Sequence, residues 1–162
     1  MRSTLNEWKA PHIIKIPEAL SAIADLRYER KGNYLFVKSS DYSKKYTVEI
    51  FENGYSSNDN MSYNNGILGY PIVVSLMLES KIEYNRYYLP LFNGINWTKL
   101  NEQYNKNFSI SYEVILNRFK QNNYDYIRIK KSIESSYEQL LVLIPFIQRK
   151  IGKYSYNDSL QT

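Results

Sequence analysis

The sequence predicts an α+β fold in a single domain, and three observations support this prediction. Between residues 33 and 57, apolar and polar side chains alternate as they do in half-buried strands. Beyond that segment, apolar residues recur at spacings of three and four, which is the helical period. The chain of 162 residues is long enough for one sizeable core, and no linker-like segment divides it. We therefore expect a small antiparallel sheet followed by a mostly helical second half.

The first predicted element is a short amphipathic helix that starts at Pro17 and ends before Gly32. Proline suits the first helical turn, and Glu18 lies near the positive end of the helix dipole. Residues 33–57 are then predicted to form a three-stranded antiparallel meander. Its second turn is expected at Asn53-Gly54, a pair that favours the positive φ angles of a type I′ hairpin.

Residues 72–78 are apolar on all sides apart from Ser75, so this segment should be buried. A helix that begins at Pro71 and a central strand both fit the run, because periodicity cannot decide so short a segment. We favour the helix.

Further helices are expected at residues 97–104 and 109–122. The longest helix is predicted from Lys130 to Lys150, where an apolar stripe has helical spacing and Pro145 should introduce a bend. The residues after it are polar and should fray. The predicted organisation is one α+β domain at residues 1–152 with a flexible tail at residues 153–162.

Composition excludes several classes of site. The chain has no cysteine, which excludes disulfides, thiolate metal sites and cysteine nucleophiles. Its one histidine, His12, has no accompanying nucleophile motif. We therefore predict no catalytic residue, metal or cofactor, and the sequence favours a protein without enzymatic activity. No apolar run approaches the roughly 20 residues of a membrane span, and no signal peptide is visible, so we expect a soluble cytoplasmic protein.

The Asn- and Ser-rich loop from Ser56 to Gly66 is one candidate ligand site. A loop of this length between a sheet and a core element often carries binding residues. Calcium-loop spacing fails, because Tyr63 and Gly69 stand where Gly and Glu are required. The plain alternative is that the Asn and Asp side chains stabilise turns. The loop candidates for ligand binding are Asn58, Asp59, Asn60 and Tyr63.

Residues 118–131 are the second candidate site. This segment holds five basic residues and one acid, Asp125, in a chain whose net charge is +5. Such an excess attracts phosphates, and interleaved tyrosines can pack on sugars or bases. The plain alternative is a solvated basic helix end. The nucleic-acid-binding candidates are Arg118, Lys120, Tyr126, Arg128, Lys130 and Lys131.

The order of elements around this segment resembles that of winged-helix DNA-binding domains. A helix at 97–104, a turn at 105–108, a helix at 109–122 and an alternating, strand-like segment at 124–129 follow the order helix, turn, helix, wing. This resemblance implies contact with DNA, but it transfers no site residue to this chain.

Three functions remain open. The first is a small intracellular, non-catalytic binding domain that contacts nucleic acid through residues 118–131. The second is a protein-interaction or self-associating module, because tyrosine suits surfaces that are half wet and half buried. The 17 tyrosines of the chain also fit an AT-rich coding bias. The third is an enzyme whose site forms around the loop at residues 56–70. The tyrosine-rich surface would include Tyr63, Tyr70, Tyr84, Tyr87 and Tyr88.

Overall fold

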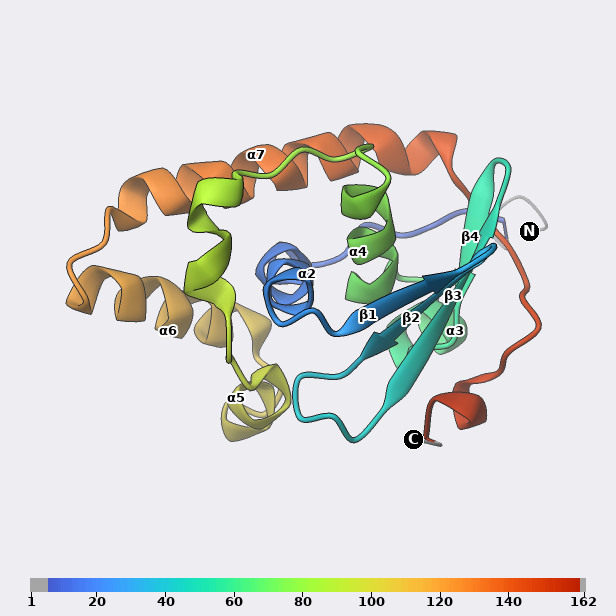
Figure 1. Ribbon diagram of the computed structural model, residues 1–162, viewed down its shortest axis with the longest axis horizontal. Coiled ribbons are helices and arrows are strands. Elements are labelled where there is room, and N and C mark those ends of the chain that lie inside the picture. Colours follow the sequence, from blue (N-terminus) through green and yellow to red (C-terminus); the bar gives the residue numbers. More distant parts are fainter. Residues whose placement is uncertain (1–5, 161–162) are drawn as a thin grey trace.

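The computed structural model describes residues 6–160 and is drawn in Figure 1. A five-stranded sheet lies toward one end of the molecule, and helices fill the rest. Neighbouring strands from β1 to β4 are antiparallel, whereas β5 pairs with β4 in parallel. The predicted α+β domain with an antiparallel meander is confirmed, but the sheet has five strands instead of three. In order across the sheet they are β1 (Tyr28–Lys31), β2 (Tyr34–Lys38), β3 (Lys45–Phe51), β4 (Gly54–Ser57) and β5 (Gln148–Arg149).

Two strands lack apolar alternation, and sequence patterns therefore do not predict them. β1 has the sequence YERK, with three of its four residues exposed, and it occupies the end of the segment predicted as helix. The helix itself, α2 (Lys15–Ala24), ends earlier, where the N–H of Arg27 donates to the carbonyl of Ala22 and Leu26 has φ +55°. β5 has only two residues and follows the last long helix.

The hairpin between β3 and β4 turns one residue earlier than predicted. Phe51 pairs with Gly54, so the two-residue loop is Glu52-Asn53, and neither Asn53 nor Gly54 has a positive φ. The type I′ prediction is therefore wrong. Gly54 has a different role: a Cβ atom there would lie 2.4 Å from the carbonyl oxygen of Gln148. Glycine is needed at this position because the backbone of β5 approaches so closely.

Helix α4 (Tyr70–Leu78) confirms the helical interpretation of the apolar run, and its residues from Pro71 to Met77 are all buried. α4 packs against α2 on one side and against β3 and β4 on the other. Ile16, Ile72 and Leu76 are fully buried where these layers meet. The core therefore sits between the sheet and the helices, as expected for an α+β domain.

Four further helical segments make up most of the second half. Three of them begin at an Asn or Asp side chain that accepts a hydrogen bond from the backbone N–H three residues later. α6 and α7 run side by side and are joined by a short turn (Figure 1). The helices predicted at residues 97–104 and 109–122 are confirmed. The segments are η1 (Arg86–Phe92), α5 (Trp97–Gln103), α6 (Phe108–Gln121) and α7 (Tyr126–Leu143).

The strand-like segment predicted at residues 124–129 is not a strand. Asp125 caps α7 by accepting from the N–H of Arg128 at 3.2 Å, so the helix already starts at Tyr126. Ile129 belongs to the buried helical stripe that continues at Ile133 and Leu140. The alternation of six residues is thus the first turns of a helix, and the wing of the winged-helix order is absent from residues 124–129.

The longest helix also ends earlier than predicted. α7 stops at Leu143, and a short 3₁₀ segment, η2 (Ile144–Phe146), contains Pro145. Proline has no N–H to continue the helical ladder, so Pro145 lies where the α-helix ends instead of bending a longer one. The chain then extends, and the N–H of Lys150 donates to the carbonyl of Tyr55 beside β4. A final 3₁₀ segment, η3 (Tyr156–Leu160), contacts β3. The mobility expected for residues 153–162 stays a prediction.

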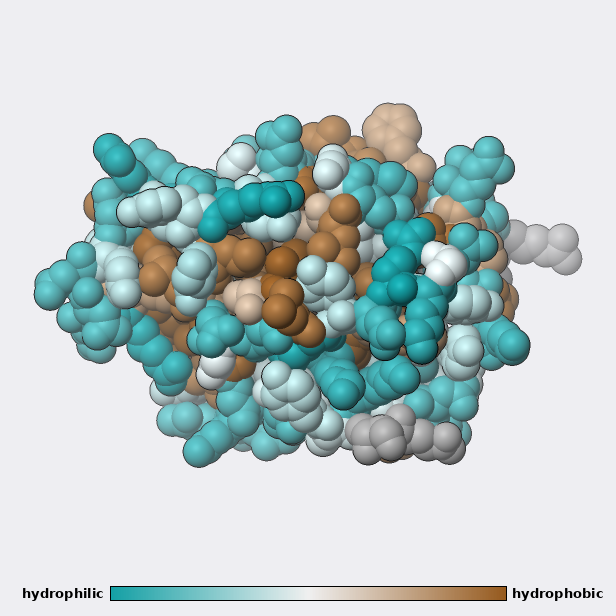
Figure 2. All heavy atoms as spheres, viewed as in Figure 1, coloured by the Kyte–Doolittle hydropathy of each residue, from teal (hydrophilic) through white to brown (hydrophobic). Residues whose placement is uncertain are grey.

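The surface of this domain is mainly polar on the side seen in Figure 2. Hydrophilic side chains cover most of that face, and apolar side chains show between them near the middle of the view. Among the described residues, none of the helices combines the length and the apolar character that crossing a bilayer requires.

Candidate ligand-binding site

Part of the predicted Asn-rich loop forms a short helix, α3 (Asn60–Asn65), directly after β4. Asp59 is the N-cap of this helix: its Oδ2 accepts from the N–H of Ser62 at 3.1 Å, and its Oδ1 accepts from the hydroxyl of Ser57. Burial raises the pKa of Asp59, while the hydrogen bonds from Ser57 and Ser62 oppose that shift. Gly69 covers the carboxylate so closely that a Cβ atom there would lie 2.1 Å from Oδ2. Asp59 therefore holds the loop together and does not face solvent.

The other three loop candidates lie in different environments. Asn58 is buried, and its Oδ1 accepts from the N–H of Thr47 at 2.7 Å. Asn60 is exposed and lines a cavity on one side of α3. Tyr63 is 44% exposed and lines a separate groove beside Trp8. The four residues thus do not converge on one site, although Asn60 belongs to the cavity described below.

The basic residues of the 118–131 segment gather where α6 turns into α7, at the left of Figure 1. Most are exposed, but Lys130 is only half-exposed. The Nζ of Lys120 lies 5.3 Å from the centre of the Tyr126 ring, and the Nε of Arg128 lies 3.4 Å from Oδ2 of Asp125. The structure therefore brings these candidates together on two helix ends, with one of the charges partly neutralised. The exposed cations are Arg118, Lys120, Arg128 and Lys131.

The tyrosines of the predicted interaction surface are distributed over separate regions. Tyr70 lines the cavity that Asn60 also lines, and Tyr63 lines the groove near Trp8. Tyr84 and Tyr88 line a third hollow next to α7. Self-association through tyrosines stays a prediction, but it would involve only part of this set.

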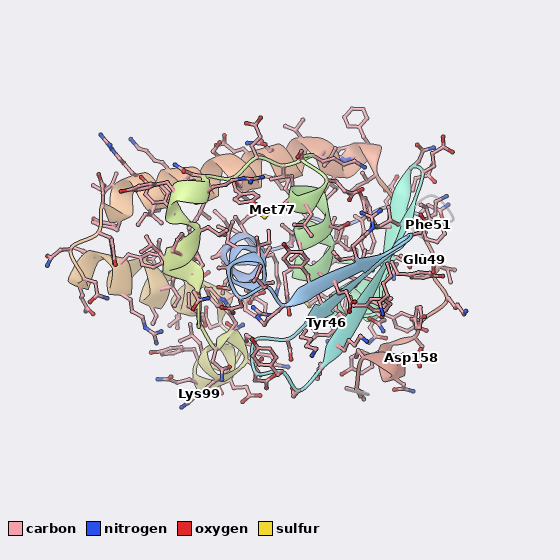
Figure 3. All side chains as sticks on the ribbon, in the orientation of Figure 1. Tyr46, Glu49, Phe51, Met77, Lys99 and Asp158 are labelled. Atoms are coloured by element: carbon pink, nitrogen blue, oxygen red, sulfur yellow. The ribbon has the colours of Figure 1, made fainter. Side chains whose placement is uncertain are left out.

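The cavity shared by Asn60 and Tyr70 has a volume of about 280 Å³ and is lined by residues of α2, the β2–β3 loop and α5. The N–H of Thr98 on α5 donates to Oγ of Ser40 at 3.2 Å and so joins two of its walls. Tyr46 projects from β3 into this region (Figure 3). Cations outnumber anions four to two in its lining. The charged lining residues are Lys15, Glu18, Arg27, Lys44, Glu102 and Lys106.

Two of these charges form an ion pair that is buried in the cavity wall. The Nζ of Lys15 lies 2.8 Å from Oε1 of Glu18, and the two side chains are 8% and 4% exposed. The second carboxylate oxygen, Oε2, accepts from Nδ2 of Asn101 at 3.0 Å. Lys15 also lies 4.6 Å from the centre of the Phe108 ring. The Glu18 carboxylate is thus fully committed to protein groups.

Arg27 is the third buried charge, with 3% of its surface exposed. Its Nε donates to Oδ2 of Asp25 at 3.0 Å, and its Nη1 donates to the carbonyl of Lys38. Its Nη2 is buried and has no hydrogen-bond partner in the described residues. A buried guanidinium nitrogen without an acceptor is costly. The guanidinium also lies close enough to the Tyr70 hydroxyl to lower its pKa against the effect of burial, but Nη2 makes no hydrogen bond of good geometry. Nη2 therefore keeps donor capacity at the cavity wall.

Aromatic side chains form the apolar part of the wall. Tyr46 and Tyr70 pack edge to face with ring centres 6.0 Å apart, and burial raises the pKa of both hydroxyls. Both therefore stay neutral at physiological pH. The indole Nε1 of Trp97 donates to Oγ of Ser21 at 2.8 Å, which fixes the position of that ring. The cavity thus combines flat apolar surfaces with a few polar groups, as small-molecule sites do.

The turn between α5 and α6 is strained at the cavity. Asn105 and Lys106 have φ values of +53° and +60°, in the left-handed region. Asn tolerates this conformation, but it costs a lysine roughly 1–2 kcal/mol. The N–H of Lys106 donates to the carbonyl of Asn101 at 2.7 Å and holds this conformation. The strained turn places the exposed Lys106 in the lining.

His12 lies next to a hydroxyl but is not arranged as a base. Its Nδ1 accepts from the N–H of Ile14 at 3.0 Å, so in the neutral ring the proton is on Nε2, which lies 3.1 Å from Oγ of Ser109. Burial and the nearby Lys15 lower the pKa of His12, which favours this neutral form. Nε2 then donates to Ser109 and cannot remove its proton.

Sequence reasoning missed most of the cavity residues. Lys15 and Glu18 are three residues apart and resemble an ordinary solvated pair on an amphipathic helix. The one available signal is that both are embedded among Ile14, Ile16 and Ala19, on the apolar side of α2. The remaining lining residues are separated along the chain and meet only through tertiary packing.

A family model described as "Uncharacterised conserved protein UCP014422" matches residues 8–144, and the chain belongs to that family. The match includes every residue of the cavity lining and the basic segment at residues 118–131. Neither the curated proteins nor the solved structures contain a match to the chain.

Proposed function

We propose that this member of the family is a non-catalytic binding domain that holds a small anion in the cavity between α2 and α5. One observation carries the proposal: Lys15, Glu18 and Arg27 are each more than nine-tenths buried, and all three line the same cavity. Charged residues are rarely buried, and each costs several kcal/mol to remove from water. Their convergence on one hollow is the arrangement expected of a polar ligand site.

The charge of the lining favours a negative ligand. The lining holds four cations and two anions, but Lys15 and Glu18 neutralise each other and Arg27 is paired with Asp25. The charges left unpaired are two lysines against Glu102. Lys44 and Lys106 add positive charge from the β2–β3 loop and from the α5–α6 turn. The volume of about 280 Å³ lies just below the usual range for ligand pockets, which begins at about 300 Å³. A metabolite-sized anion therefore fits better than a polymer.

Binding without chemistry is the simpler proposal, because the groups that could act as bases are already committed. Both oxygens of Glu18 accept hydrogen bonds from Lys15 and Asn101. Nε2 of His12 donates a hydrogen bond to Ser109, whereas a general base would have to accept a proton at that nitrogen.

Charge reversal at the cavity tests the proposal. Titration calorimetry with a panel of small dicarboxylates and inorganic phosphate at low salt should detect binding, and Lys44→Glu should weaken it by about tenfold (~1.4 kcal/mol). Lys99→Glu is the matched control, because Lys99 lies on α5 but points away from the cavity and is exposed (Figure 3). Equal weakening by both variants, or no binding of any anion in the panel, would contradict the proposal.

Nucleic-acid binding through residues 118–131 is a second candidate. The observation that favours it is the exposure of four cations around one helix turn, with the Tyr126 ring beside Lys120. Such a surface should bind with an affinity that falls steeply as salt rises. Lys120→Glu combined with Lys131→Glu should reduce that salt dependence, whereas Lys99→Glu should not. Absence of binding to a mixed nucleic-acid panel at about 50 mM salt would remove this candidate.

A further inference from the structure

We infer that the cavity ligand is a small amino acid or amino-carboxylate with a net negative charge, an inference that rests on the proposed anion-binding function. The reason is that the cavity wall contains one buried donor and one buried acceptor that the protein leaves without partners. The donor is Nη2 of Arg27, and the acceptor is Oδ1 of Asn101. An anion without an N–H or O–H group, such as a plain dicarboxylate, can satisfy only the first of these two atoms.

The donor favours a carboxylate or a similar acceptor. Two of the three nitrogens of Arg27 are occupied, one by Asp25 and one by the carbonyl of Lys38. Nη2 carries two N–H groups that no described residue accepts, so it is the nitrogen with most donor capacity left for a ligand. An ionised oxygen is the strongest acceptor for such a group.

The acceptor requires a ligand that donates. Nδ2 of Asn101 donates to the Glu18 carboxylate, which can only accept, and this contact fixes which end of the amide is the oxygen. Oδ1 is therefore the free end, and it can only accept. A ligand ammonium group supplies the missing N–H, and the exposed carboxylate of Glu102 lines the same cavity and favours that positive charge.

The two unpaired atoms are shielded from solvent, although both of their residues line the cavity. Ligand contact therefore involves small adjustments of the side chains that cover these two atoms, of the kind that is common when sites are filled. Lys44 and Lys106 are the two lining cations without an ion-pair partner among the described residues, and they favour a second negative group on the ligand. An amino-dicarboxylate, with two carboxylates and one ammonium group, meets all three requirements.

Matched ligand pairs test this inference on the full chain. L-glutamate and glutarate differ only in the α-ammonium group, as do L-aspartate and succinate. We expect the amino member of at least one pair to bind tenfold or more tightly than its partner in titration calorimetry. Asn101→Leu should remove that preference by weakening the amino ligand to the level of the plain dicarboxylate. Gln103→Leu is the control, because Gln103 lies on the same helix, is exposed and is outside the cavity lining.

The outcomes separate this inference from the proposed function. Equal affinity for both members of each pair, unchanged by Asn101→Leu, would overturn the amino-acid inference and leave anion binding intact. No binding of any anion would overturn both. If Asn101→Leu does not fold, the comparison of glutamate with glutarate on the unaltered protein decides the matter alone.

Discussion

Replacement of Lys15 by methionine should destabilise the protein by about 3–5 kcal/mol, because it leaves Glu18 as a buried charge without its partner. The pair is close, with 2.8 Å between Nζ and Oε1, and neither side chain is more than 8% exposed to solvent. Methionine keeps most of the apolar stem of Lys15, so packing against Phe108 is largely preserved. The loss therefore comes from the charge of Glu18 and not from a cavity in the core.

The double variant Lys15→Met/Glu18→Gln separates charge from packing. Glutamine at position 18 can still accept from Nδ2 of Asn101, so that hydrogen bond is kept while both charges disappear. We expect the double variant to lie within about 1 kcal/mol of the wild type, since exchanging a buried pair for neutral groups is often neutral. The two changes should thus be strongly coupled.

Urea denaturation, followed by tryptophan fluorescence at neutral pH, measures these differences in the free energy of unfolding. Lys31→Met is the control, because the Lys31–Glu29 pair spans 3.6 Å with both side chains more than 60% exposed. That variant should change stability by less than about 0.5 kcal/mol. The reasoning is refuted if Lys15→Met costs less than about 1 kcal/mol, or if the double variant loses the sum of its two single changes.

Three further outcomes follow from individual contacts and can be measured by the same unfolding titrations. Burial lowers the pKa of His12, so His12 binds a proton less readily in the folded protein than in the unfolded chain. The free energy of unfolding should therefore fall as pH drops below about 6.5, and His12→Asn should reduce that fall. Burial raises the pKa of Asp59, so its carboxyl group stays protonated to a higher pH in the folded protein than in the unfolded chain. The free energy of unfolding should therefore decline as pH rises above about 4. Asp59→Asn can still cap α3 and should flatten that decline. A pH profile of either variant that parallels the wild type would contradict the corresponding argument. Gly69→Ala should cost about 1–3 kcal/mol because of the clash with Asp59, since φ of −85° at Gly69 suits any residue; an unchanged urea midpoint would show that the contact is not tight.

Much of the fold could be predicted from local patterns. The apolar run after Pro71 and the helical spacing of apolar residues at 97–104 and 109–122 are signals that act within a few residues, and the structure agrees with them. The errors arise where tertiary contacts decide. β5 exists because the chain passes beside β4, and Gly54 permits that approach instead of forming a type I′ turn. Residues 124–129 alternate, yet their buried stripe continues along α7 and makes them helical.

The candidate site was less accessible from sequence. Asp59 and Asn58 stand out in the sequence as loop residues, but both side chains already accept hydrogen bonds from nearby backbone N–H groups. The cavity residues carry no motif, because Lys15, Arg27 and Asn101 meet only after α2, β1 and α5 have packed. A charge on an apolar helix face is a weak signal when partners more than eighty residues away determine whether it is solvated or buried.

The most direct test of anion binding in this cavity uses the two tryptophans of the chain as reporters. Trp97 lines the cavity, and its indole N–H donates to Oγ of Ser21. The indole N–H of Trp8 donates instead to the carbonyl of Gln148, and Trp8 lines the groove that Tyr63 also lines. In a ¹H–¹⁵N spectrum titrated with L-glutamate and then glutarate, the Trp97 indole signal should move and saturate, while the Trp8 signal stays in place. Movement of Trp8 without Trp97, or of neither at saturating anion, would contradict binding in the cavity.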